Sequence, residues 1–345
     1  MQDKQEPWKV TTPVQMEPHK LVRRVPLAPH QYLTQITPQS DIFVLAHFGI
    51  PRFDVRSWSM EIGGLVRSPR RLTFDDIRSL PKREVQTVHQ CAGFPKKHWV
   101  PTRRVSNAVW GGADLKALLD EVGLLPEARY LWSYGMDHGR FDDVSAPCYL
   151  KDMPLERLEN GDVILAYEVN GEPLDQEHGH PVRLMIPGYY GTNSVKWLSR
   201  IEVASTRAEG PFTTLLYNDP VDPDAKEPHG KTYPVWEIRP ESLIVNPAPG
   251  MKVGKSPIEV WGWSWADGGV ASVDVSMDGG AHWHRAMLDE QVERSWQKFR
   301  LLWRPESSGE FDLISRATAK NGLVQPLTNA RNAAHNVQVT VIGDV

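Results

Sequence analysis

VDVSMDGG, at residues 273–280, decides the fold class of the C-terminal part of this chain. Its apolar and polar residues alternate, as in a strand with one buried face, and Asp278-Gly279-Gly280 suits a tight hairpin turn. Further short apolar runs that resemble strands follow at 296–303, 311–318 and 337–342. Because helical periodicity is scarce after Glu241, this spacing predicts a β-sandwich.

The preceding part of the chain mixes helix and strand patterns. Thr73 followed by Asp76 predicts a capping box at the start of a helix through Leu80. Apolar residues on one helical face predict a second helix over 115–122, ended by Gly123. Strands are predicted at 84–90, 163–167, 182–186 and 195–203. Helix and strand do not alternate regularly, so the pattern indicates an α+β fold rather than a doubly wound sheet.

We therefore predict two domains and an arm. Residues 1–40 are polar and rich in proline, as in an extended arm. A mixed α+β domain would occupy 41–228 and an all-β domain 235–345, joined through the polar, proline-bearing link 219–234. The chain has 345 residues, of which 40% are hydrophobic, and this is enough for both cores.

The charge balance argues against nucleic acid as a partner. The formal net charge is −4, the pI is about 6.3, and lysines and arginines form no run. No stretch approaches the roughly 20 apolar residues needed to cross a bilayer, so we expect no membrane span. The chain start, MQDKQEPWKVTTP, lacks a secretory or twin-arginine signal. We expect a cytoplasmic protein, or a periplasmic one if an export signal has been removed.

The cysteines and tryptophans are the first candidates for a site. Two cysteines occur, too few for a disulfide framework or a multi-cysteine iron–sulfur or zinc site. Cys91, in the segment HQCAG at 89–93, can be a catalytic nucleophile, a metal ligand, or a small buried apolar residue. Cys148 has no such context, and we expect it to be structural. Thirteen tryptophans indicate a wide core or a deep aromatic pocket.

A cationic pair of segments is the second candidate. HGHPVR at 178–183 is followed closely by SVKW at 194–197. His178, Arg183 and Lys196 suit a phosphate or another oxyanion, because guanidinium binds it through two N–H groups and ammonium binds it as a point charge. The alternative is a solvated loop with scattered charge.

Other chemistries lack their motifs. His178 and His180 could face one metal ion, but no further cysteine or paired carboxylate joins them, which weakens a zinc hydrolase. There is no Gly-x-Gly-x-x-Gly after a strand, no Walker loop and no Gly-x-Ser-x-Gly. Dinucleotide, nucleoside triphosphate and serine hydrolase functions are therefore not indicated.

Taken together, these segments resemble the sulfite oxidase family of molybdenum enzymes in order and spacing. The likeness begins at about residue 40 and includes QCAG at 90–93, AYEVNGEPL at 166–174 and VDVSMDGG at 273–280. It implies a molybdopterin-binding domain followed by an immunoglobulin-like dimerisation domain, and hence a homodimer. The implied cofactor is molybdenum–molybdopterin, which requires one soft protein ligand and an anion cradle.

The resemblance also assigns roles to individual residues. It implies that Cys91 is the thiolate ligand of molybdenum and that Trp110 lies in the substrate pocket. Tyr217 would hydrogen-bond an oxygen atom or incoming water beside the metal, and Lys96 would neutralise negative charge on the substrate. The residues implied to hold the pterin and its phosphate are His47, Asp137, His178, Arg183, Ser194 and Lys196.

The substrate end departs from the family pattern. Leu45 stands where sulfite-oxidising members have arginine, and Lys96–Lys97 replaces two arginines after the cysteine. A third arginine has no clear match, although Arg331 lies nearby in the sequence, and Arg103–Arg104 offers partial compensation. Leucine binds no anion, and lysine lacks the two-pronged geometry of arginine, so a substrate less charged than sulfite becomes an alternative.

These observations predict an enzyme that performs two-electron oxygen-atom transfer, with oxidation of sulfite to sulfate as the leading reaction. Alternative substrates are another small sulfur compound or a sulfoxide. The alternative from another class is a non-catalytic binding protein with a β-sandwich module and an inert Cys91. Because the chain lacks a Cys-x-x-Cys-His haem attachment motif, we expect no haem on it. Electrons would then pass to an external acceptor, either a cytochrome or dioxygen.

Overall fold

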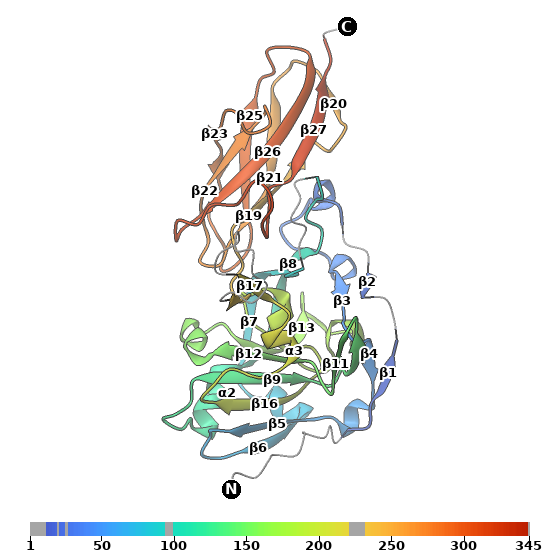
Figure 1. The fold of residues 1–345 in the computed structure, drawn as a ribbon, viewed down its shortest axis with the longest axis vertical. Helices are drawn as coiled ribbons and strands as arrows, with labels where there is room; N and C mark the ends of the chain where they lie inside the picture. Colours follow the sequence, from blue (N-terminus) through green and yellow to red (C-terminus); the bar gives the residue numbers. More distant parts are fainter. Residues whose placement is uncertain (1–11, 19–20, 25–26, 94–98, 221–231, 344–345) are drawn as a thin grey trace.

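The computed structural model describes residues 12–18, 21–24, 27–93, 99–220 and 232–343. The molecule is elongated, with the N-terminal region (12–220) at one end and the C-terminal region (232–343) at the other (Figure 1). Strands dominate both regions, so the chain is richer in strand than the α+β prediction implies. The α-helices of the described part are α1 (Phe74–Ser79), α2 (Leu115–Val122) and α3 (Pro211–Thr214). None of the helices in these ranges is long and apolar enough to cross a membrane.

The N-terminal region contains two larger sheets. One has the strand order β12 (Leu150–Pro154), β9 (Tyr130–Gly135), β16 (Leu198–Ala204), β5 (Ser59–Gly64) and β6 (Arg70–Thr73). The other has the order β14 (Glu172–Pro173), β13 (Ile164–Val169), β8 (Val105–Asp114) and β7 (Lys82–Gln90), with β15 (Arg183–Met185) also paired to β13. Neighbouring strands are antiparallel except for β16 and β5. One apolar cluster takes side chains from both sheets, among them Ile62, Leu165 and Ile201.

The helices form where the sequence supplies caps. Thr73 and Asp76 make the predicted capping box, in which each backbone N–H donates to the other side chain. α1 ends one residue before Leu80. α2 follows Asp114, whose carboxylate accepts two backbone N–H groups of the first turn. It ends at Gly123, which has a φ of 68° and so occupies the left-handed region that favours glycine. Both predicted helices are therefore present.

Strand β7 carries the chain from the surface into the interior. It pairs with β8 along its whole length, from Lys82 opposite Ala113 to Gln90 opposite Val105. Its first residues are exposed and its last four are buried. The strand predicted at 84–90 is the inner part of this longer strand, and it delivers Cys91 to the interior.

Short two-stranded ribbons complete the N-terminal region. The segment predicted as an extended arm contributes one strand to each of two such ribbons. The pairs are β1 (Gln15–Glu17) with β4 (Ile50–Arg52) and β2 (Val22–Arg24) with β3 (Val44–Leu45). Elsewhere β10 (Gly139–Phe141) pairs with β11 (Val144–Ala146), and β17 (Asn218–Pro220) pairs with β18 (Thr232–Pro234).

The C-terminal region is built from two sheets that share one core. The first has the order β19 (Glu241–Asn246), β21 (Ile258–Trp265), β25 (Gln297–Trp303) and β24 (Met287–Leu288). The second has the order β20 (Lys252–Val253), β27 (Asn336–Val341), β26 (Gly309–Ala319), β22 (Val270–Ser276) and β23 (His284–Arg285). Phe299 from the first sheet and Val273 and Val339 from the second meet in the core. The hairpin of β22 and β23 is joined by 277–283, a longer connection than the tight turn predicted at Asp278-Gly279-Gly280.

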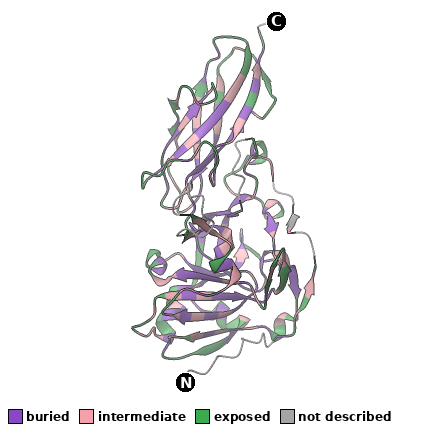
Figure 2. Ribbon diagram, in the orientation of Figure 1, coloured by how far each residue is buried: buried purple, intermediate pink, exposed green. Residues whose placement is uncertain are grey.

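A third apolar cluster joins the two regions. Tyr32 and Val88 pack in it with Trp263, Trp265 and Trp296 of the C-terminal region. The rings of Trp263 and Trp296 stack with their centroids 5.0 Å apart. Buried residues lie along the inner strands of both regions and at this junction (Figure 2). Four of the tryptophans, Trp261, Trp263, Trp265 and Trp296, therefore serve a core between the regions, where large rings remove much apolar area from water.

Candidate functional site

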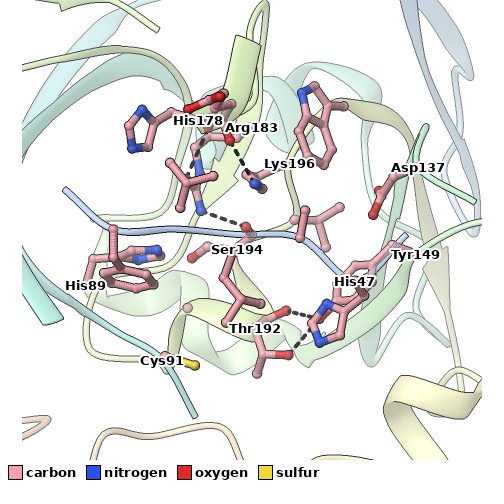
Figure 3. Close-up of a pocket in the computed structure, with 18 of the residues that line it drawn as sticks. His47, His89, Cys91, Asp137, Tyr149, His178, Arg183, Thr192, Ser194 and Lys196 are labelled. Atoms are coloured by element: carbon pink, nitrogen blue, oxygen red, sulfur yellow. Dashed lines mark hydrogen bonds between the residues drawn. The ribbon is translucent and has the colours of Figure 1, made fainter. Parts of the chain in front are cut away.

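A pocket with about 640 Å³ of empty space, in part open to solvent, lies in the N-terminal region. β3 and its following loop, the end of β7 and the loops on either side of β15 supply most of the wall (Figure 3). The predicted site residues that line it are His47, Cys91, Asp137, His178, Arg183, Ser194, Lys196 and Tyr217. Residues 170 positions apart in the sequence thus share one cavity.

Two predicted site residues are not part of this wall. Trp110 is 0% exposed and lies behind the pocket, with its ring centroid 4.9 Å from the guanidinium carbon of Arg183 and 5.6 Å from the centroid of the His89 ring. The structure therefore gives it contact with the wall rather than with the cavity. Lys96, like Lys97, lies outside the described residues.

The thiol end of the pocket is apolar. Cys91 follows β7 directly and is held there by its backbone N–H, which donates to the carbonyl of Arg104 at 2.9 Å. Its side chain packs with Phe43 and Leu45. Burial raises the pKa of the thiol, although nearby positive charge partly opposes this. By itself the thiol keeps its proton at neutral pH, and a bound metal would stabilise the thiolate.

Two arginines lie beside the thiol but outside the pocket wall. Arg331, from the C-terminal region, donates to the carbonyl of the residue after Cys91 and forms a two-pronged ion pair with Asp219 at 2.6 and 3.0 Å. Arg104 donates to the next carbonyl along the chain. Both arginines lower the pKa of the thiol, whereas Arg103 is exposed. Positive charge therefore reaches the thiol end from behind its apolar surface.

The opposite end of the pocket is polar. His178 Nδ1 lies 2.9 Å from Asp175 Oδ1, and its buried Nε2 has no partner in the described ranges. Arg183 donates to the carbonyls of His178 at 3.1 Å and Ser194 at 2.9 Å, while its Nε lacks a partner there too. Burial lowers the pKa of Arg183 to about 9, so it is still cationic at neutral pH. Since carbonyls carry no net charge, this cation can still bind an anion.

Lys196 is the second cation of the polar end. Its Nζ donates to the carbonyl of Glu177 at 2.8 Å and lies 4.2 Å from the centroid of the Trp197 ring. Burial lowers the pKa of Lys196 and raises that of Asp137. Ser194 Oγ accepts a hydrogen bond from a backbone N–H at 3.1 Å. A charged ligand would therefore decide how Lys196 and Asp137 are protonated.

Tyr217 and His47 form a hydrogen-bonded pair in the pocket. His47 Nε2 lies 2.6 Å from the hydroxyl of Tyr217, so the predicted pterin contact His47 is already engaged at this atom. Burial, followed by Lys196 and Lys151, lowers the pKa of His47 to about 3, and its ring is therefore neutral. Burial raises the pKa of Tyr217, which keeps its phenol proton. Tyr217 has a φ of 59°, an uncommon conformation that clusters at functional sites.

Sequence reasoning missed four polar residues of the wall: His89, Tyr149, Glu177 and Thr192. His89 begins the segment HQCAG, Glu177 directly precedes His178, and Thr192 lies two residues before Ser194, so their position in or near those motifs was the available signal. Tyr149 had none, because it reaches the pocket only through the fold. Its hydroxyl lies 2.6 Å from Thr192 Oγ1.

The donor set fits an elongated ligand with a soft metal at one end and an anion at the other. A single thiolate suits such a metal. Buried polar atoms normally have hydrogen-bond partners, so the unpartnered atoms of His178 and Arg183 favour a ligand between them. A zinc site at His178 and His180 is not supported, since no three His, Cys, Asp or Glu side chains of the described part converge.

Comparison with known proteins agrees with this geometry. Residues 47–212 match the family described as oxidoreductase molybdopterin binding domain, and residues 232–339 match the Mo-co oxidoreductase dimerisation domain. The chain is 31% identical to mitochondrial sulfite oxidase of Mus musculus, with 89% of this chain and 62% of the mouse protein covered. It is 34% identical to sulfite oxidase of Arabidopsis thaliana, with 76% and 72% covered. The predicted molybdopterin cofactor is thus confirmed.

A solved structure shows the same likeness. The chain matches the sulfane dehydrogenase SoxCD from Paracoccus pantotrophus with a TM-score of 0.77 and 29% identity, over 90% of this chain and 82% of that chain. The chain spans about three-fifths of the length of the mouse protein (62%).

Proposed function

The chain belongs to the sulfite oxidase family of molybdopterin oxidoreductases, and from this premise we propose that it transfers an oxygen atom to a small sulfur compound, with sulfite as the leading substrate. The observation that carries the proposal is a single pocket with the Cys91 thiol at one end and the cations Arg183 and Lys196 at the other. This is the arrangement that a metal-bearing, phosphate-tailed cofactor requires.

The chain's own residues divide the task of holding the cofactor. Cys91 would bind the metal, and His178, Arg183, Ser194 and Lys196 would hold the organic part and its phosphate. When bound, the cofactor supplies a molybdenum centre that exchanges an oxygen atom and two electrons with a substrate. The backbone hydrogen bonds of Arg183 and Lys196 fix their direction in advance, so little side-chain freedom is lost on binding.

Tyr217 would act on the substrate side of the pocket. Its hydroxyl keeps its proton and is oriented by neutral His47 at 2.6 Å. A phenol held in this way can donate a hydrogen bond to an oxygen atom or can position a water molecule. The uncommon backbone conformation of Tyr217 supports this role.

A neutral sulfur compound is the second candidate substrate. Phe43 and Leu45 form an apolar wall beside Cys91, and no arginine belongs to the described pocket wall at that end. A dianion such as sulfite would have to give up water there without a two-pronged partner. The structural likeness to a protein named as a sulfane dehydrogenase supports a sulfur compound other than sulfite as an alternative substrate.

The C-terminal region would provide the assembly. We propose an immunoglobulin-like sandwich that forms a homodimer, which the match of residues 232–339 to a dimerisation domain supports. Electrons would leave to an external acceptor, a cytochrome or dioxygen.

The deciding experiment combines composition with turnover. Purified protein should contain about one molybdenum per chain, by plasma mass spectrometry, and a matching amount of pterin. It should also oxidise sulfite or a neutral sulfur compound with ferricyanide as acceptor. Sulfite and thiosulfate are assayed beside an organic sulfide to rank substrates by kcat/KM. Protein that carries neither molybdenum nor pterin after expression in a cofactor-producing host would refute the proposal.

A further inference from the structure

His89 is a buried polar residue that no predicted role explains. It is 6% exposed, lines the pocket, and lies between Cys91 and Arg183 (Figure 3). Its ring is stacked on Phe43 with centroids 5.5 Å apart at an angle of 14°, and it leans against Trp110 at 5.6 Å. Two aromatic rings therefore fix the plane of the imidazole in the pocket wall.

The hydrogen-bonding capacity of His89 is unused by the protein. Neither ring nitrogen has a hydrogen-bond partner in the part of the chain that the structure describes. Imidazole offers one donor and one acceptor, and in the described part of the chain both are left open to the pocket that His89 lines. Packing alone would be served at lower cost by leucine or phenylalanine. The unused nitrogens therefore favour a ligand in the pocket as their partner.

Gly191 makes room for this ring. A Cβ at position 191 would lie 2.7 Å from His89 Cε1 and 2.9 Å from His89 Nε2, closer than such atoms approach. Gly191 also lines the pocket. Any larger residue there would push His89 out of its stacked position, so the glycine and the histidine form one unit.

A ligand that extends from the thiol to the cations must pass His89. We propose that His89 is a further cofactor-binding residue, which hydrogen-bonds the organic part of the cofactor between its metal and its phosphate, and that Gly191 is required to seat it. The inference rests on the proposed function. It adds a residue that the family resemblance did not assign and that lies outside the cationic cluster.

The test compares cofactor release from variants of the holoenzyme. Molybdenum and pterin are measured per chain after gel filtration and then over time, by plasma mass spectrometry and by pterin fluorescence. His89→Leu should release both at least about tenfold faster than the unaltered protein, the effect of one buried hydrogen bond. His89→Gln keeps a donor and an acceptor and should retain the cofactor better than His89→Leu. A residue that merely packs would give the reverse order.

Substitution of Gly191 provides a second, independent test. Gly191→Ala should release cofactor as His89→Leu does, whereas Gly63→Ala, where a Cβ meets nothing within 4 Å, should behave like the unaltered protein. In a His89→Ala background, Gly191→Ala should add little further loss, because the clashing ring is gone. Thermal melting of each variant confirms that it is folded.

The outcomes separate this inference from the proposed function. If the unaltered protein holds molybdenum and pterin but His89→Leu releases them no faster, His89 does not bind the cofactor and the function stands. If His89→Leu retains more than His89→Gln, the role is packing. If the unaltered protein holds no molybdenum and no pterin, both proposals are wrong.

Discussion

The two ends of the pocket are held in place by different parts of the chain. At the polar end, His178, Arg183 and Lys196 form their hydrogen bonds within residues 175–196. Arg24 joins this segment from outside through ion pairs with Asp175 and Glu177. At the thiol end, both neighbours of Cys91 are held by the C-terminal region. Their partners there are Glu241, Trp265, Asn332 and Arg331.

This difference indicates that the thiol end of the pocket depends on the contact between the N-terminal and C-terminal regions. The side-chain bonds from the C-terminal region to the neighbours of Cys91 span 151 to 242 positions, whereas the hydrogen bonds of His178, Arg183 and Lys196 span at most 19 positions. A change in the C-terminal region should therefore alter the thiol end first. The following predictions test that division.

Removing the thiolate should have the largest effect. Cys91→Ser replaces a soft ligand with a hard one and should lower molybdenum-dependent turnover by more than about 100-fold, beyond the loss typical of groups around a ligand. Cys148→Ser, at a half-buried cysteine outside the pocket wall, should change turnover less than about twofold. Full molybdenum-dependent activity of Cys91→Ser would contradict the assignment of the thiol end.

Removing a cation at the polar end should loosen the cofactor. Lys196→Met deletes one charge-assisted bond and should weaken cofactor retention by about 10- to 100-fold, measured as loss of pterin and molybdenum on dilution. Lys298 is the matched control, because its Nζ also lies over a tryptophan ring, at 4.1 Å from the centroid of Trp261, but in the C-terminal region. If Lys196→Met and Lys298→Met retain the cofactor equally well, Lys196 does not hold the cofactor phosphate.

Adding a cation at the thiol end should change substrate preference. Leu45→Arg brings a two-pronged donor to the apolar wall and should raise kcat/KM for sulfite relative to a neutral sulfur compound by about tenfold. Leu33→Arg, at an exposed leucine, is the control. If the ratio stays constant, the apolar wall does not govern preference between charged and neutral substrates.

The contact between the two regions should make the stability of the folded protein depend on pH, through Glu241. Burial raises the pKa of Glu241 to about 8, against an ordinary 4.5, and no cation contacts its carboxyl in the described ranges. The folded protein thus binds more protons than the unfolded chain between these values. This contribution to stability is complete below about pH 4.5 and is lost as the pH rises through 8.

Glu241→Gln mimics the protonated side chain and should abolish this dependence. The melting temperature of the unaltered protein should fall between pH 5 and pH 9 by roughly 5 °C more than that of Glu241→Gln, for a difference of about 4 kcal/mol. Calorimetry of both proteins at the two pH values measures it. Parallel curves would show that Glu241 does not titrate in this range.

Prediction from sequence succeeded where the contacts are local. The capping box of Thr73 and Asp76 and the helix over 115–122 are present, and the cationic segments do form one cluster. It failed where a side chain reaches the pocket through the fold. Tyr149 had no local signal, and the tight turn predicted at Asp278-Gly279-Gly280 is part of a longer loop, since β23 begins only at His284.

Arg331 shows the same limit more clearly. The sequence placed it only near a suitable position, whereas the structure carries it across 239 positions to the carbonyl of Ala92. Trp110 lies behind Arg183 and His89 rather than in the wall. Neither the contact of Arg331 nor that of Trp110 follows from the spacing of residues along the sequence. Spacing does not specify how distant segments of the chain pack together.

The sequence by itself determined the ligand groups, one soft thiol and an anion cradle within 178–196, and it also determined that the C-terminal region is rich in strand. The sequence could determine these features because the type of a residue sets its ligand chemistry, and because the hydrogen bonds of the cradle join residues that are close together in the sequence. Only the tertiary structure decided that thiol and cradle share one pocket and that Glu241 and Arg331 hold the thiol end. Burial and long-range packing create those contacts, and they exist only once the two regions meet.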